Sequence, residues 1–444
     1  MAKFTPHTEE NINEMLTAIG VSSIEKLFKD IPDELKVKSF EIPPGLTEYE
    51  VLKIFRDLTE KNKNNYISFL GGGYYDHFIP SAVDFISSKA EFFTAYTPYQ
   101  PEASQGTLRA IFEYQTMVAK ISGMEAANAS LYDGGTALYE AVVMAVRQTK
   151  KSRVIIDTGV NPLFRKILIT HIKNFEIELI EVELNEIYPD KEKIKEFIDD
   201  NTAAVIVQSP NFFGIIEDYS DIFEIVQKKG TTGIMSYYPL SLGILKTPGE
   251  MGADIAVAEG QSLGIPLSFG GPYLGLMSVN NKYVRKIPGR IVGETVDTEG
   301  KRAYVLTLQA REQHIRREKA TSNICSNQAL CALRAAAYLS LLGKDGYENV
   351  ALLNLERAEY LKKCLKEVNK IKVKEGVTFN EFTIEVEGGA KSFVNKMLSK
   401  GYVAGLPASF FYNKYKDYLI VNVTEKRTED EINSFIKAVK EVLK

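Results

Sequence analysis

Short apolar runs alternate with amphipathic stretches through the middle of the chain. The apolar runs are bounded by turn residues and predict strands at 153–157, 177–182, 203–208, 232–235 and 254–258. Between most of them lie stretches with helical spacing, for example 163–175 and 220–229. The gap from Met235 to Asp254 contains two prolines and is expected to be a loop. This order predicts βαβ units, and hence a parallel sheet covered on both faces.

The first 65 residues predict an all-helical arm. Capping boxes are expected at Ser22 with Glu25 and at Thr47 with Glu50. An arm of this length is too short to make a core of its own, so we expect it to pack on another surface.

The pattern changes again from about residue 324. Helical spacing predicts a long helix over 327–342 and a charged helix over 353–368, and the last helix is expected to start at Glu429. Strands are predicted at 381–386 and 418–423. We therefore expect three parts: the helical arm (1–65), a large α/β domain with a mainly parallel sheet (66–323) and a smaller α+β domain (324–444).

The composition is that of an ordinary globular protein. Of the 444 residues, 45% are hydrophobic and 25% are charged, with a net charge of −4. This charge argues against nucleic acid or an anionic membrane as the main partner. No apolar run approaches the ~18 residues of a membrane span, and no signal peptide is expected. Three cysteines suit a reducing compartment, which predicts a cytoplasmic protein.

The strand and loop at 253–272 look like a unit that would present an amine to a cofactor. In enzymes that hold pyridoxal phosphate, such a unit supplies the lysine that bonds to the cofactor aldehyde. This loop carries Gln261 and Ser262, and no lysine lies between Lys246 and Lys282. An amide cannot form a Schiff base. The chain is therefore either not an enzyme of that kind or one half of such an enzyme.

A glycine turn stands directly before the predicted helix 138–148. Backbone N–H groups of Gly134, Gly135 and Thr136 could approach an anion such as a phosphate at the start of this helix. Glycine turns before helices are common, and Asp133 beside the glycines would repel an anion. Both readings, a phosphate loop and an ordinary turn, remain open on these residues alone.

The segment 94–106 contains two prolines within four residues and predicts a stiff extended loop before a helix. Phenol and amide side chains held on such a loop could form the wall of a site. The alternative is a surface loop fixed by aromatic packing. The candidates on this loop are Tyr96, Tyr99, Gln100, Glu102 and Gln105.

A dense basic run occupies 311–319. Such a run is usually a solvated face, and a lone histidine within it is more often structural than catalytic. Its candidate binding residues are Arg311, His314, Arg316, Arg317 and Lys319. The spacing of Cys325 and Cys331 predicts no metal site, and no catalytic triad is evident.

Five stretches together resemble the glycine-cleavage P-protein family, glycine dehydrogenase (decarboxylating). The resemblance extends over essentially the whole chain, and within the family it is to the α subunit of the split bacterial form. The stretches are Tyr96–Glu102, Ser104–Gly106, Asp133–Ala137, Gly289–Gly293 and Arg311–Cys325.

The resemblance implies a fold-type I pyridoxal phosphate architecture, like that of aspartate aminotransferase. It implies that Gln261 occupies the Schiff-base lysine position, so that no catalytic residue is expected on this chain. Enzymes of this fold also hold the pyridinium nitrogen with an aspartate. The expected place, after the strand ending at Met235, has Ser236, Tyr237 and Tyr238. The loop at 134–136 would then be a vestigial phosphate loop.

The resemblance also implies a division of labour between two chains. The family decarboxylates glycine and transfers the aminomethyl group to the lipoyl arm of the H-protein. Pyridoxal phosphate is expected in the partner β subunit, with none covalently bound to this chain. The loop with Tyr96 would complete the partner's active site, and the run 311–319 would line the lipoyl approach or brace the subunit junction.

Two alternatives stay open. One is an autonomous pyridoxal phosphate enzyme whose lysine has moved, for example to Lys246 or Lys282. The other is a noncatalytic scaffold that keeps the fold and only binds a partner or ligand.

Overall fold

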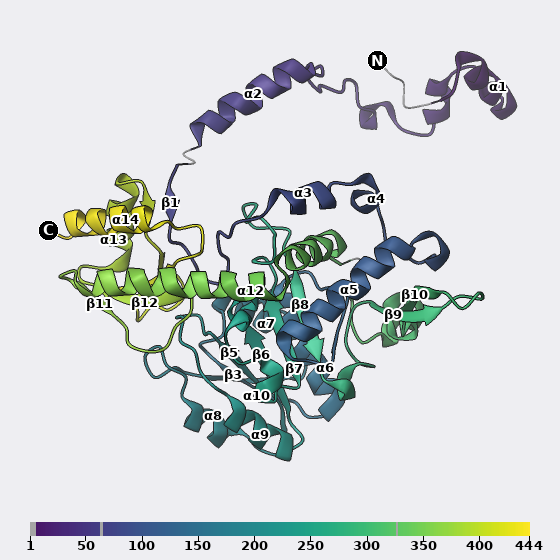
Figure 1. The fold of residues 1–444 in the computed structure, drawn as a ribbon. Coiled ribbons are helices and arrows are strands. Elements are labelled where there is room, and N and C mark those ends of the chain that lie inside the picture. Colours follow the sequence, from purple (N-terminus) through teal and green to yellow (C-terminus); the bar gives the residue numbers. More distant parts are fainter. Residues whose placement is uncertain (1–5, 63–64, 326) are drawn as a thin grey trace. The chain divides into compact units, whose positions relative to one another are not determined.

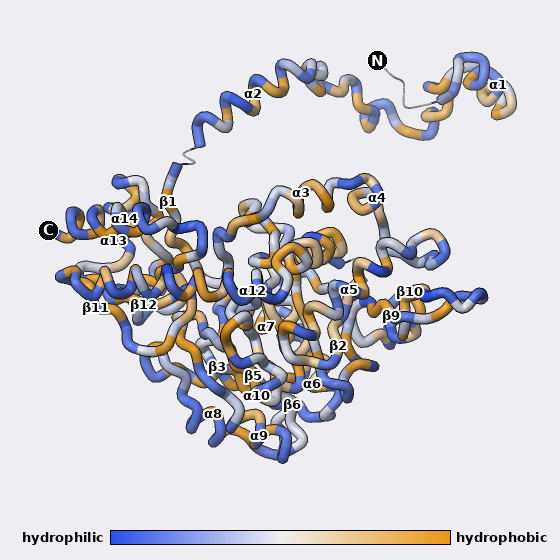
Figure 2. The backbone as a smooth tube through the Cα atoms, in the orientation of Figure 1, coloured by the Kyte–Doolittle hydropathy of each residue, from blue (hydrophilic) through white to orange (hydrophobic). Residues whose placement is uncertain are grey.

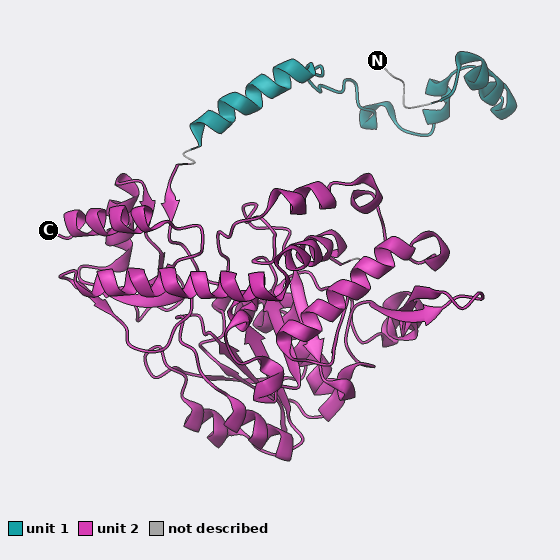
Figure 3. Ribbon diagram, in the orientation of Figure 1, with its two compact units in different colours: residues 1–64 teal, residues 65–444 magenta. Residues whose placement is uncertain are grey.

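The computed structural model describes residues 6–62, 65–325 and 327–444. The chain divides into two compact units, residues 1–64 and residues 65–444 (Figure 3). The arm predicted over 1–65 also includes residues 1–5, 63 and 64, which lie outside the described residues.

The first unit consists of helices, which Figure 1 labels in part. They are α1 (Glu9–Ile19), the 3₁₀ turns η1 (Ile24–Phe28) and η2 (Asp33–Leu35), and α2 (Glu48–Lys61). The capping box of Thr47 and Glu50 is confirmed. The box predicted at Ser22 and Glu25 is wrong, because the chain forms a five-residue 3₁₀ turn whose N-cap, Ser23, makes no side-chain capping bond.

This unit buries almost none of its apolar side chains. Leu16 is the one buried residue among the described residues 6–62. On α2, Val51, Leu52, Phe55 and Leu58 are all exposed, with Phe55 at 62%. Figure 2 shows hydrophobic and hydrophilic positions alternating along this helix. The unit therefore has amphipathic helices but no core of its own.

A seven-stranded sheet forms the centre of the second unit, in the order β2-β8-β7-β6-β5-β3-β4. The five strands β3 to β7 run parallel to one another, and β8 and β2 are antiparallel additions at one edge. The strands are β2 (Ala126–Ala127), β3 (Arg153–Asp157), β4 (Glu178–Val182), β5 (Thr202–Ser209), β6 (Thr232–Tyr237), β7 (Ile255–Glu259) and β8 (Gly275–Val279). The predicted, mainly parallel sheet is thus confirmed.

Helices cover both faces of this sheet, as the buried strands require. Ile156 and Ile206 face the cluster that contains α6 and α7, whereas Ile155 and Val205 face the cluster that contains α8 and α9. Near β7, α5 and α12 pack over Ala256. These helices are α5 (Gln105–Ser122), α6 (Gly134–Thr149), α7 (Pro162–Ile172), α8 (Lys191–Phe197), α9 (Ser220–Lys228) and α12 (Ala329–Lys366).

The prediction that the whole gap between β6 and β7 is a loop is wrong. The gap contains η4 (Pro239–Gly243) and α10 (Pro248–Met251). The two prolines stand in the first turns of these elements, where no backbone N–H is needed. The prolines therefore begin helices here instead of excluding them.

The C-terminal part of this unit is built on α12 and a four-stranded antiparallel sheet in the order β11-β12-β15-β14. The two predicted helices, 327–342 and 353–368, form one helical run that is interrupted only at Gly343 (φ 59°, ψ −169°). The predicted strands at 381–386 and 418–423 are confirmed as β12 and β15. The elements are β11 (Ile371–Val373), β12 (Glu381–Val386), α13 (Ala390–Ser399), β14 (Leu406–Pro407), η8 (Ala408–Phe410), β15 (Tyr418–Asn422) and α14 (Glu429–Val442).

Smaller elements connect these parts. The two-residue strands β1 (Ile67–Ser68) and β13 (Tyr402–Val403) pair in parallel, and β9 (Ile291–Val296) pairs antiparallel with β10 (Arg302–Thr307). The remaining elements are α3 (Ser81–Ser87), α4 (Ala90–Phe93), η3 (Pro101–Ala103), η5 (Asn281–Tyr283), η6 (Gln309–Arg311), α11 (Gln313–Arg316) and η7 (Arg317–Lys319). In the described part of the chain, every helix is too short or too polar to span a lipid bilayer.

Candidate functional site

The carboxyl ends of β5, β6 and β7 meet at one edge of the parallel sheet, where ligands bind in folds of this kind. A cavity at this edge is lined by Gln208, Ser236 and Glu259 from the strand ends, and by Tyr75 and Glu381 from outside the sheet. Its volume is about 30 Å³, whereas small-molecule sites usually measure about 300–1,000 Å³. The chain's own side chains therefore fill most of this place.

Gln261, which follows β7, is 3% exposed and is fully engaged with backbone groups. Its Oε1 accepts a hydrogen bond from the Tyr75 N–H at 2.9 Å. Its Nε2 donates to the Tyr75 carbonyl at 3.0 Å and to the Ile265 carbonyl at 2.9 Å. A lysine ammonium only donates and could not accept the Tyr75 N–H. The amide is therefore suited to this place in a way that an amine is not.

The glycine turn at the start of α6 faces a carboxyl group of the same chain. The Gly134 N–H donates to Glu259 Oε2 at 3.0 Å. Asp133 is the N-cap of the helix, and its Oδ1 accepts the Thr136 N–H at 2.7 Å. A Cβ on residue 134 would lie 2.6 Å from the ring of Phe164. Glycine at this position thus permits the close approach of α7 to the helix start.

The end of β6 offers no carboxylate to a pyridinium nitrogen. Ser236 and Tyr237 are buried, and the Tyr238 hydroxyl is hydrogen-bonded to His77 Nε2. The loop after β7 supplies no amine, and Glu259 faces the turn that would hold a phosphate. The residues of this cleft consequently do not fit pyridoxal phosphate.

The loop before α5 and the basic run meet around Arg290. The Tyr99 hydroxyl accepts a hydrogen bond from Arg290 Nη2 at 3.0 Å, and the Tyr99 ring contacts His314 edge-on at 5.7 Å between ring centroids. Arg290 is 4% exposed, and its Nη1 donates to the Cys325 carbonyl. Two segments that are over 200 residues apart, represented by Tyr99 and His314, therefore form one cluster.

The other candidates on the loop divide into two kinds. Gln105 holds α5 to β10, because its Oε1 accepts the Tyr304 N–H at 2.9 Å and its Nε2 donates to the Tyr304 carbonyl at 2.8 Å. Tyr96, Gln100 and Glu102 are exposed. Gln105 thus shapes the loop, whereas the other three present their side chains outward.

The basic run also divides. Arg311 Nη2 donates to the Gly289 carbonyl at 2.7 Å, and burial lowers the pKa of the Arg311 guanidinium from its usual value. Arg316, Arg317 and Lys319 are exposed. Arg311 therefore joins the cluster around Arg290, and the later cations form a separate exposed group.

Sequence reasoning missed three residues of these sites: Arg290, Glu259 and Glu381. Glu381 accepts hydrogen bonds from the Gly72 N–H at 2.6 Å and from the Tyr75 hydroxyl at 2.8 Å, and burial raises its pKa to about 7. The available signal for Arg290 was a single cation within an apolar stretch. Glu259 is the last residue of β7, and Glu381 is the first residue of β12.

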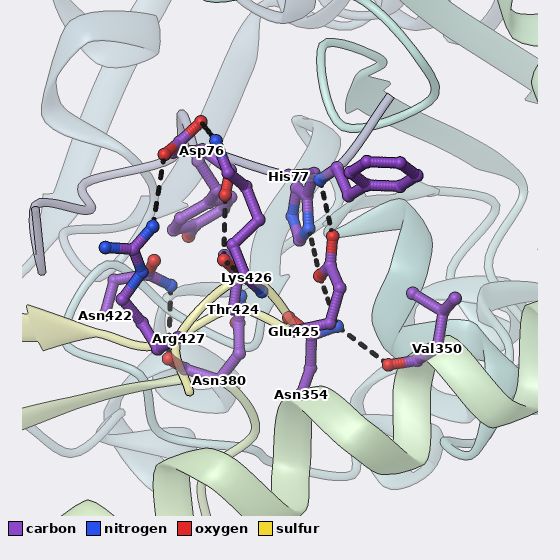
Figure 4. A network of polar contacts seen from close by, with 12 residues as sticks. Asp76, His77, Val350, Asn354, Asn380, Asn422, Thr424, Glu425, Lys426 and Arg427 are labelled. Atoms are coloured by element: carbon purple, nitrogen blue, oxygen red, sulfur yellow. Dashed lines mark hydrogen bonds and ion pairs between the residues drawn. The ribbon is translucent and has the colours of Figure 1, made fainter. Parts of the chain in front are cut away.

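A polar network anchors the segment that contains Tyr75 (Figure 4). His77 Nδ1 lies 2.7 Å from Glu425 Oε2, which also accepts a hydrogen bond from Asn354 at 2.9 Å. Burial acts to raise the pKa of Glu425, but His77 and the hydrogen bonds bring it down to about 2. Beside it, Lys426 lies 2.7 Å from Asp76. The network ties this segment to α12 and to the chain after β15.

The described residues are 6–62, 65–325 and 327–444. Nowhere in these ranges do three or more His, Cys, Asp or Glu side chains gather in a way that could hold a metal ion. Cys325, Cys331 and Cys364 are all free.

Comparisons with known proteins agree on one family. The model of the glycine cleavage system P-protein family matches residues 2–439. A protein of Citrifermentans bemidjiense, described as a probable glycine dehydrogenase (decarboxylating) subunit 1, is 50% identical over 441 residues, which cover 99% of each chain. A crystal structure of glycine decarboxylase (P-protein) in inhibitor-bound form is 41% identical, with a TM-score of 0.91 over 100% of both chains.

A more distant structure carries the fold alone. Glutamate decarboxylase of Lactobacillus brevis is 13% identical, with a TM-score of 0.68 over 94% of this chain and 97% of its own. The fold is the fold-type I architecture of pyridoxal phosphate enzymes, as predicted. With a family match across nearly the full length and a relative at 50% identity, the chain belongs to the glycine cleavage system P-protein family.

Proposed function

We propose that this chain is the α subunit of a two-chain glycine dehydrogenase (decarboxylating), and that a lysine-bearing β subunit holds pyridoxal phosphate. The complex decarboxylates glycine and transfers the aminomethyl group to the lipoyl arm of the H-protein. The family match and the description of the Citrifermentans bemidjiense relative as subunit 1 support this proposal.

The observation that carries the proposal is the state of Gln261. Its amide is buried and bonded to the Tyr75 backbone at both ends, at 2.9 and 3.0 Å. A chain with this arrangement supplies no amine to a cofactor aldehyde. Chemistry that needs such an amine must take place on another chain of the complex.

The cluster of Tyr99, Arg290 and His314 is the part of this chain that completes the partner's site. Its phenol is held by a buried guanidinium, so its position is defined before any partner binds. Tyr96, Gln100 and Glu102 lie on the same loop as Tyr99 and are exposed. Glycine, an amino acid with no side chain, needs contacts only to its amino and carboxylate groups, and cationic and phenolic groups serve the carboxylate.

The exposed cations Arg316, Arg317 and Lys319 have two possible roles. They line the approach of the lipoyl arm, or they brace the junction with the β subunit. In the first case charge reversal weakens the use of H-protein and leaves assembly intact. In the second case it weakens assembly itself.

Reconstitution tests the function. The purified chain, a lysine-bearing P-protein chain and their mixture are supplied with pyridoxal phosphate, lipoylated H-protein and carboxyl-labelled glycine. We expect release of labelled CO₂ only from the mixture, together with copurification of the two chains. A β-type chain with its lysine replaced is the matched control, and its mixture should be inactive.

Two other results would favour the alternatives. A borohydride-reducible Schiff base on this chain alone would indicate an autonomous enzyme that uses a lysine such as Lys246 or Lys282. Copurification without activity in the mixture would indicate a scaffold. We further propose the cytoplasm as the location, since three free cysteines suit a reducing compartment.

A further inference from the structure

Glu259 fills a backbone recess at the edge of the parallel sheet. Its Oε2 accepts the N–H of Gly134, the first residue of α6, at 3.0 Å. Its Oε1 accepts the N–H of Gln261 at 3.0 Å and the N–H of Leu274 at 3.1 Å. The three donors come from a helix start, a loop and a strand approach, so only the folded chain brings them together.

Three converging backbone N–H groups, one of them at a helix N-terminus, are a binding arrangement for an oxyanion. A phosphate monoester presents three oxygens to such donors, and a carboxyl group presents two. Asp133 already caps the same helix by accepting the Thr136 N–H. The recess is therefore complete without any ligand, because the chain supplies its own acceptor.

We propose that the Glu259 carboxyl group takes the place of a phosphate in this recess and thereby excludes phosphate-bearing ligands from the chain. The missing lysine and the missing carboxylate at the end of β6 are then two of three changes that remove the cofactor. The third is a side chain that occupies the cofactor's phosphate position and cross-links β7 to α6.

Burial and packing support this role. Glu259 is 6% exposed. A Cβ added to residue 134 would lie 2.6 Å from the ring of Phe164 and 2.9 Å from the backbone N of Glu259. Burial raises the pKa of Glu259 to about 8, while the three N–H donors act to lower it. A group held this closely leaves no room for a second occupant.

The test opens the recess and offers inorganic phosphate as the probe. In full-length Glu259→Ala, three buried N–H groups lose their acceptor, and we expect one phosphate to bind per chain, at least ~10-fold more tightly than to the unaltered chain. Equilibrium dialysis with labelled phosphate measures the binding. Thermal unfolding in phosphate, compared with chloride at equal ionic strength, should show stabilisation of this variant alone.

Glu140→Ala is the matched control. Glu140 is also buried, also lies on α6 and is 6% exposed, but its carboxyl group interacts with Ser322 and Arg147 instead of the recess donors. This variant should lose stability without gaining phosphate binding. Equal phosphate binding by the unaltered chain, or none by a folded Glu259→Ala chain, would overturn the proposal.

The variant remains informative if it folds poorly. Recovery of the native circular dichroism spectrum in phosphate but not in chloride would support the proposal, because phosphate then replaces the lost acceptor. Failure to recover in both would contradict it, and Glu259→Ser, which restores a single small acceptor, should show the same dependence on phosphate.

Discussion

The side chain of Gln261 pairs with the backbone of Tyr75 as a neighbouring strand would. Its oxygen accepts the Tyr75 N–H at 2.9 Å, and its nitrogen donates to the Tyr75 carbonyl at 3.0 Å. The two residues are 186 positions apart in the chain. The place where a catalytic amine would stand thus serves to fix the backbone of a crossing segment.

Replacing Gln261 with alanine should destabilise the chain. The change removes three hydrogen bonds and leaves the buried Tyr75 N–H and the Ile265 carbonyl without partners, whereas the Tyr75 carbonyl keeps the His77 N–H at 3.1 Å. Each group left without a partner costs about 1–3 kcal/mol. The midpoint of chemical unfolding should fall accordingly. Gln227→Ala, which removes a glutamine amide bonded to the Gly252 carbonyl at the surface, is the control and should have a smaller effect.

Restoring a lysine should not restore cofactor binding. In Gln261→Lys the ammonium cannot accept the Tyr75 N–H, Ser236 offers no carboxylate, and Glu259 still fills the recess at α6. Incubation with pyridoxal phosphate and borohydride should therefore leave no covalently bound cofactor on the peptide that contains residue 261. A stoichiometric label at this position would contradict the account of the cleft.

Loss of the Tyr99 hydroxyl should reduce the activity of the assembled complex more than the stability of the isolated chain. Tyr99→Phe removes the bond from Arg290, a contact at a half-exposed position, so the isolated chain should lose no more than about 1–2 kcal/mol. Glycine decarboxylation by the assembled complex should fall about 10-fold or more. Tyr49→Phe, an exposed tyrosine of the first unit, is the control. Normal turnover by an assembled Tyr99→Phe complex would contradict the role of this cluster.

Glu381 should make stability depend on pH. Burial raises its pKa from the usual 4.5 to about 7. Between these values the folded chain holds a proton that the unfolded chain has released. The stabilising contribution is therefore complete below pH ~4.5 and is lost as pH rises through about 7, with a slope of up to ~1.4 kcal/mol per pH unit.

Glu381→Gln should remove this part of the slope, since the amide does not titrate. Unfolding free energies measured across this window should differ between the two chains by an amount that changes with pH. The exposed Glu91→Gln serves as the control and should follow the unaltered chain in parallel. A difference that does not change with pH would show that folding leaves the pKa of the Glu381 carboxyl group unshifted.

Local patterns were enough to predict the five parallel strands of the large sheet and two strands of the C-terminal sheet. The strand at 153–157 agrees with β3 at both ends, and the one at 381–386 agrees with β12. Such runs are buried on both faces, so every position carries the signal. The first of the two C-terminal helices ends before Gly343, as the pattern predicts, because the dihedral angles of Gly343 are not helical. The second helix begins before residue 353, earlier than predicted.

From the sequence, only the missing cofactor-binding groups of the cleft could be predicted, not its contacts. The missing lysine at 261 is visible in the sequence, but the contacts of Gln261 and Glu259 reach across 186 and 125 positions. No periodicity connects Tyr75 with a loop after β7. Likewise, Arg290 acquires its meaning from Tyr99, which only the folded chain brings within 3.0 Å.

The buried hydrogen bonds of residues 72–77 restrict domain motion within the second unit. This stretch is bonded to β12 through Glu381, to the loop after β7 through Gln261 and to the chain after β15 through Glu425. Domain closure requires a boundary between two parts of the structure at which contacts can shift or break at low energetic cost. Here buried hydrogen bonds join residues 72–77 to the parts on either side. The hydrogen-bonded backbone amides of residues 72–77 should therefore exchange with solvent only on global unfolding. The second unit should act as a rigid body during turnover and leave any opening and closing to other parts of the assembly.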